Sequence, residues 1–126
     1  AINIFKDNGQ RFLQQNFSKL DQIQFLINRY YSSLINLQNF FKLHKINYLF
    51  YNGLENYTTT GKKDHDNLDS YIDKKRFFAW NDEKLVHYNF CVDNKLELEN
   101  DGHASEQGVI QYSNLLIDYI DTHSLI

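Results

Sequence analysis

The longest periodic pattern in this chain lies between residues 19 and 44. Apolar side chains recur there every three or four residues, a spacing that places them on one side of an α-helix. Further apolar residues make that side broader than a coiled-coil seam, so packing within a domain is favoured over a coiled coil. The stripe consists of Leu20, Ile23, Ile27, Tyr30, Leu34, Leu37 and Phe41, broadened by Leu26, Tyr31, Ile35 and Phe40.

A short aromatic segment, residues 46–51, follows this helix and ends at Asn52-Gly53. Its β-branched and aromatic residues predict a buried strand, and the helix before it favours a strand parallel to its neighbours. A helix, a strand and a loop at the carboxyl end of the strand form an α/β unit, and ligands gather at such ends. With 126 residues the chain is long enough to form a single domain with its own core, residues 1–126. We therefore expect an α/β protein.

The segment between this strand and the last quarter of the chain has a weaker pattern. Residues 67–72 predict one or two helical turns. A second helix would begin after Asn81, a suitable N-cap, with Asp82 and Glu83 in its first turn. A strand is the alternative for the same region, since apolar residues also alternate at Val86, Tyr88, Phe90 and Val92.

Three features of this middle segment permit a binding role, but a structural role is favoured for each. Asp64-His65-Asp66 has the chemistry of a metal site, yet such a group on a polar loop is more often solvated. Aromatic residues as dense as those at positions 77, 78 and 80 belong more often to a core than to a sugar-binding surface. Cys91, the only cysteine, is expected to be a small buried apolar residue. No metal and no cofactor is expected.

Composition excludes several classes of protein. A hydrophobic content of 42% excludes an intrinsically disordered chain. The net charge is −3, and the longest run of basic residues is residues 74–76, so binding to nucleic acid through a basic face is not expected. No apolar run approaches the length of a membrane span, and a single cysteine forbids an internal disulfide.

The last quarter of the chain places a histidine directly before a helix. Ser105 is the expected N-cap and Glu106 lies in the first turn, where the helix dipole favours an anion. His103 precedes them on a turn that contains Gly102, where an imidazole backed by a buried helix reaches solvent, as acid–base catalysis requires. A helix N-terminus with a merely solvated histidine is the alternative. The helix is expected over residues 105–121, with an apolar side formed by Val109, Tyr112, Leu116 and Tyr119.

The string Asn100-Asp101-Gly102-His103-Ala104-Ser105-Glu106-Gln107-Gly108 resembles the C-terminal block of SGNH (GDSL-type) hydrolases. That block reads Asp-x-x-His-Pro-(Ser/Asn)-x-x-Gly, and in this chain Asn100 replaces the aspartate and Ala104 the proline. The resemblance implies a three-layer α/β/α fold, flavodoxin-like in architecture, and the chemistry of a serine esterase. It makes His103 the general base, oriented by Asn100 or by Asp101.

The other motifs of that family are absent from the chain. None of its five glycines begins Gly-Asp-Ser, and neither Asn-Asp pair follows a glycine at the spacing of the family. The match covers about residues 18–121, which correspond to the second half of the family's domain, so the missing blocks would precede Ala1. The chain is then part of a larger protein, a subunit whose partner completes the sheet, or a degenerate relative kept as a structural module.

These observations together predict a non-catalytic structural or interaction module that is not an enzyme by itself. The alternative is the C-terminal half of a serine esterase, supplying His103 to a nucleophile outside this chain. The expected partner is another protein chain or a missing N-terminal half, and not nucleic acid or a membrane. Abundant Asn, Ile, Lys, Tyr and Phe point to an AT-rich genome, so we expect a viral or phage virion component, with the cytoplasm as the other location.

Overall fold

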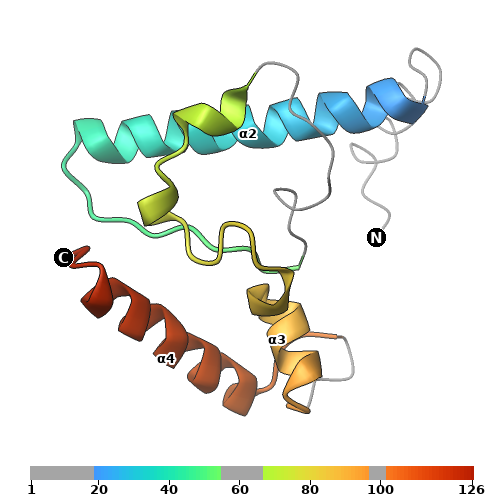
Figure 1. Ribbon diagram of the computed structural model, residues 1–126, viewed down its shortest axis with the longest axis vertical. Helices are drawn as coiled ribbons and strands as arrows, with labels where there is room; N and C mark the ends of the chain where they lie inside the picture. The colour runs from blue at the N-terminus through green and yellow to red at the C-terminus, as the bar shows by residue number, and fades with distance from the viewer. Residues whose placement is uncertain (1–18, 55–66, 97–101) are drawn as a thin grey trace, which may run out of the picture. The chain divides into compact units, whose positions relative to one another are not determined.

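The computed structural model describes residues 19–54, 67–96 and 102–126 (Figure 1). The chain divides into two compact units. The smaller unit comprises residues 1–37 and 63–72, and the larger unit comprises residues 38–62 and 73–126. The elements in chain order are α2 (Lys19–Leu43), the 3₁₀ turns η1 (Leu68–Tyr71), η2 (Lys74–Arg76) and η3 (Glu83–Leu85), and the helices α3 (His87–Asp93) and α4 (Glu106–Thr122).

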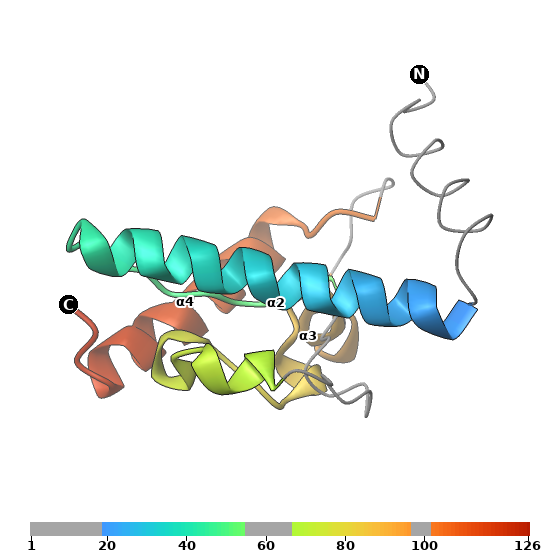
Figure 2. The ribbon, with the colours of Figure 1, turned by 90° about the horizontal axis from the view of Figure 1, so that it is seen from above.

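Helix α2 confirms the long helix predicted from the apolar spacing (Figure 2). Its buried side differs from the predicted stripe, however, because the buried positions are Ile27, Tyr31 and Gln38. These three residues are spaced by four and seven positions, which is also one side of a helix. Leu37, a member of the predicted stripe, is 44% exposed. A broad apolar surface therefore predicted the helix correctly but not which line of residues would be buried.

The three α-helices in the described part of the chain end in the same way. The second residue beyond each helical end adopts a left-handed conformation, with φ between 51° and 55°. The next residue is apolar and its N–H reaches a carbonyl five residues back, which is the Schellman arrangement. The left-handed residues are Lys45, Lys95 and Ser124, and the bonds are Ile46 N to Phe41 O, Leu96 N to Cys91 O and Leu125 N to Ile120 O.

The predicted α/β fold and its parallel strand at residues 46–51 are wrong. The described residues form an all-α structure without strands, in which an isolated parallel bridge joins Phe50 to Phe77. Phe50 N donates to Arg76 O and Phe78 N donates to Phe50 O. This ladder cannot extend because η2 ends at Arg76 and a turn with positive φ at Ala79 follows. Residues 46–51 have the sequence of a strand, but no neighbouring described segment stays extended to pair with them.

The core of the larger unit is built around α3, α4 and the residues that follow η2. Phe77 is 2% exposed and Cys91 is 0% exposed, and Phe78 is also buried, which confirms the expected core roles of these residues. Tyr112 of α4 contacts the ring of Phe78 edge to face and donates its hydroxyl to Leu85 O at 2.7 Å. Rings meeting in this way contribute more than the area they bury.

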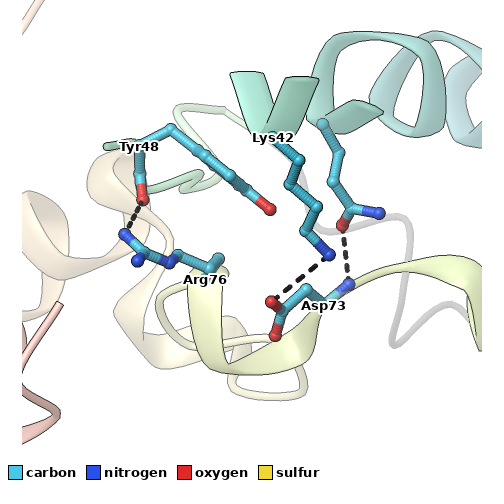
Figure 3. Close-up of polar contacts among 5 residues, drawn as sticks. Lys42, Tyr48, Asp73 and Arg76 are labelled. Carbon is cyan, nitrogen blue, oxygen red and sulfur yellow. Dashed lines mark hydrogen bonds and ion pairs between the residues drawn. The ribbon is translucent and has the colours of Figure 1, made fainter. Parts of the chain in front are cut away.

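Polar contacts fasten the end of α2 and the following segment to η2 (Figure 3). Gln38 accepts a hydrogen bond from Asp73 N at 2.7 Å, and Lys42 Nζ lies 3.6 Å from a carboxylate oxygen of Asp73. Arg76 donates to the carbonyls of Tyr48 and Leu125 at 3.2 and 3.0 Å. Because the arginine joins a loop to the chain beyond α4, it holds together segments far apart in the sequence.

The region from Asn81 to Val92 is helical rather than extended. Asp82, not Asn81, is the N-cap, and its side chain accepts a hydrogen bond from Lys84 N at 3.0 Å. Val86 has extended backbone angles and separates η3 from α3. The helical turns predicted at residues 67–72 appear as η1. The Asp64-His65-Asp66 cluster lies outside the described residues.

Candidate functional site: a cavity beside His103 and the outer face of α4

The start of α4 confirms the predicted cap and positions His103. Ser105 has extended backbone angles, and its Oγ accepts a hydrogen bond from Gly108 N at 3.1 Å. Gly108 is buried against Cys91, so the first turn of the helix is anchored on α3. His103 lies two residues before the cap and is exposed. An exposed histidine is thereby attached to a helical end that cannot shift freely.

His103 lines a cavity of about 280 Å³. Three segments of the chain line this cavity: the loop after residue 52, the start of α3, and the turn before α4 together with the first turn of that helix. The described residues that line it are Gly53, Leu54, His87, Tyr88, Gly102, His103, Ala104 and Val109. The cavity therefore combines two imidazoles with apolar walls and two glycines.

His87 is the member of this cavity that the sequence did not indicate. Its backbone N–H donates to Asn52 O at 3.0 Å, and its ring stacks on Tyr112 with centroids 4.5 Å apart. Burial lowers the pKa of His87, and its Nε2 is buried without a hydrogen-bond partner among the described residues. The sequence around His87 contains no motif that indicates a site residue, because the environment of this histidine is created by α4.

The site lacks the other parts of a serine hydrolase among the residues that can be described. Asn100 and Asp101, the two predicted orienting residues, lie outside the described residues. None of the described residues lining the cavity is a serine or threonine. Nor does any group of three or more metal-ligating side chains occur in the described part of the chain. The described lining thus provides two imidazoles and the phenol of Tyr88, but no serine or threonine nucleophile.

A second candidate surface lies on α4. It carries exposed apolar and acidic residues, and we term it the α4 outer face. Ile110 and Ile117 are 48% and 53% exposed, seven residues apart on one side of the helix. Asp118 and Asp121 are exposed near the C-terminal end, and α4 contains no Lys, Arg or His. The face consists of Glu106, Ile110, Asn114, Ile117, Asp118 and Asp121.

Comparison with known proteins identifies no relative of this chain. No family model matches it, and neither a curated protein nor a solved structure is similar to it. Across the described ranges, no helix has both the length and the apolar character needed to cross a membrane.

Proposed function

We propose that this chain is a non-catalytic structural or interaction module that binds another protein through the α4 outer face. The observation that carries the proposal is the pair of exposed isoleucines, Ile110 and Ile117, between acidic residues. Protein interfaces commonly have an apolar centre and a polar rim. The bound surface would carry an apolar patch bordered by basic side chains, because the carboxylates of the α4 outer face would then be paired.

Two further features support an interaction module over an enzyme. The backbone of α4 is anchored by its N-cap at Ser105 and by the packing of Gly108 on α3, so its outer face is presented on a rigid element. A rigid surface loses little conformational entropy on binding. His103 lines a cavity to which no described serine or threonine contributes.

A serine esterase half is the second candidate, and the cavity favours it. His103 faces the same space as Gly53 and His87, so a substrate could reach an imidazole flanked by backbone and apolar walls. The chain would then supply the acid–base histidine to a nucleophile of another polypeptide. This candidate requires a serine brought into contact with His103, whereas the interaction module does not.

Site-specific photocrosslinking tests the proposed docking face. A benzophenone amino acid at position 117, and separately at position 110, is introduced into the protein within the assembly or cell that naturally contains it. We expect one discrete protein adduct from both positions, identified by mass spectrometry. Position 81, an exposed asparagine in a turn, is the control. An adduct pattern identical at 81 and 117, or none from positions 110 and 117, would refute docking on this face.

A further inference from the structure

We infer that the α4 outer face binds the C-terminal end of α2 in a second copy of this chain, an inference that rests on the proposed function. The surface at the end of α2 consists of Phe40, Leu43, His44, Lys45 and Ile46, all exposed, and we term it the α2 tip. Both surfaces belong to the larger unit, so each copy would present one of each.

The α2 tip has the apolar character that the proposed partner surface requires. Phe40 is 51% exposed and Leu43 is 78% exposed, three residues apart and therefore on neighbouring positions of the helix surface. The ring of Phe40 lies against His44 with centroids 4.5 Å apart, which makes a broad contact surface. Ile46, which closes the Schellman turn after α2, is 46% exposed.

The charges of the two surfaces are complementary. Residues 36–47 contain Lys42 and Lys45 and no acidic residue, whereas α4 contains three acidic residues and no basic one. Lys42 is already 3.6 Å from Asp73, but its side chain remains half exposed, and Lys45 is also exposed. Two lysines beside an apolar patch thus match the acidic rim of the α4 outer face.

The position of the carboxylates on α4 gives a second electrostatic reason. Asp118 and Asp121 lie near the C-terminus of the helix, where the macrodipole disfavours a negative charge, and the last turn contains no basic residue. A cation from a second molecule would relieve this repulsion. The end of α2 is suited to supply it, since Lys42 and Lys45 are exposed there and residues 36–47 contain no acidic residue.

An interface between two different surfaces of the same chain has a distinctive consequence. Each copy retains one unused α4 outer face or one unused α2 tip, so assembly continues until a ring closes or a filament forms. A symmetric dimer through two α4 outer faces would bring six carboxylates together, three from each helix, which disfavours that arrangement.

Complementation between two interface variants tests this inference with the full chain. In Ile110→Lys/Ile117→Lys the α4 outer face is disrupted, and in Phe40→Glu/Leu43→Glu the α2 tip is disrupted. Each variant alone should self-associate at least about tenfold more weakly than the parent in sedimentation equilibrium. An equimolar mixture should instead form a one-to-one complex, because each partner supplies the surface that the other lacks.

Charge reversal provides a second test of the same interface that leaves the apolar residues unchanged, in case the apolar substitutions impair folding. Asp118→Lys/Asp121→Lys should weaken self-association, and mixing it with Lys42→Glu/Lys45→Glu should restore a complex. High salt should weaken the parent assembly in the same measurement. Circular dichroism spectra and thermal unfolding of every variant serve as folding controls.

Two outcomes would overturn the inference. One is self-association of the α2-tip variant that equals the parent, which would show an interface that does not use α2. The other is a monomeric parent at concentrations up to about 100 μM, weaker than specific protein association normally requires. In the second case an adduct to a different protein at position 117 would leave the proposed function standing while the self-assembly failed.

Discussion

At the scale of single residues, Gly108 shows how closely α3 and α4 are packed. A Cβ atom at this position would lie 2.9 Å from Cys91 Sγ, closer than carbon and sulfur approach without displacement. Cys91 is fully buried, and protein interiors are close-packed, so its sulfur can move only by displacing other atoms. The glycine is therefore required by its neighbour and not by its own backbone.

We expect Gly108→Ala to lower the free energy of unfolding by about 1–3 kcal/mol, the usual cost of overpacking. In an exposed helical position the same substitution would stabilise the helix by about 1 kcal/mol. Urea denaturation measures both this variant and Cys91→Ala. The free energy of unfolding of the double variant should fall by less than the sum of the two single decreases, because removing the sulfur makes room for the methyl group. Strict additivity would contradict a direct clash.

His87 should make folding stability depend on pH. Burial lowers its pKa in the folded state, while the unfolded chain binds a proton near pH 6.5. The unfolded state therefore binds more protons below that pH, and the stability associated with neutral His87 is lost as the pH falls from about 6.5 toward the folded-state pKa. His87→Phe keeps the stacking on Tyr112. Its free energy of unfolding should change less between pH 7 and pH 5 than that of the parent.

The matched control for this prediction is His44→Asn, which changes an exposed histidine and leaves His87 in place. Denaturant unfolding at a series of pH values measures the slope for both variants and the parent. A slope in His87→Phe that equals that of the parent would show that the buried imidazole does not account for the pH dependence.

At the scale of elements, helix ends follow from local chemistry even where the residue is unusual. Lys95 holds the left-handed conformation at φ 55° that glycine adopts most readily. The arrangement persists because Leu96 N bonds Cys91 O and an apolar residue follows the turn. The hydrogen bond that closes this turn thus compensates for the strain of the lysine backbone.

Replacing the strained residue should stabilise the protein. We expect Lys95→Gly to raise the free energy of unfolding by about 1 kcal/mol, since glycine removes the Cβ repulsion of the left-handed region. Lys84→Gly is the control, because Lys84 lies in η3 outside the left-handed region and is also exposed. The free energy of unfolding of that control should fall by about 0.5–1 kcal/mol, because glycine is more flexible in the unfolded chain. Equal effects of the two substitutions in chemical denaturation would argue against strain at Lys95.

At the scale of the whole molecule, the two candidate functions differ in whether His103 performs chemistry. An amide at Asn100 can orient an imidazole but cannot stabilise its protonated form as a carboxylate does. The corresponding change in a serine protease lowers turnover by about 10⁴. We therefore expect this chain to show no measurable hydrolysis of short-chain aryl esters, measured by release of nitrophenol. His103→Ala should leave thermal unfolding nearly unchanged because the side chain is exposed.

Hydrolysis that disappears both in His103→Ala and after treatment with a serine-reactive phosphonate would favour the esterase half. Loss of self-association in His103→Ala without esterase activity would instead place His103 in an interface. The nitrophenol assay and sedimentation of the same samples distinguish these results.

The sequence by itself determined the two long helices, because their hydrogen bonds and caps connect residues close in the chain, whereas it left the region of α3 open between a helix and a strand. The spacing over residues 19–44, the N-cap at Ser105 and the apolar side of α4 were enough to place α2 and α4 within a residue of their bounds. The core roles of Phe77 and Cys91 also followed from residue type. By contrast, the resemblance to SGNH hydrolases led to a sheet that the described residues do not form.

Tertiary structure alone decided which segments meet. Residues 46–51 have the composition of a strand, but a strand needs a partner that stays extended, and the chain beside Phe50 turns away after Phe77. His87 became part of the cavity beside His103 because α3 packs on the start of α4, which no local pattern encodes. The exposure of Ile110 and Ile117 likewise depends on which side of α4 faces Cys91 and Phe78, since burial is a property of the neighbours that the fold supplies.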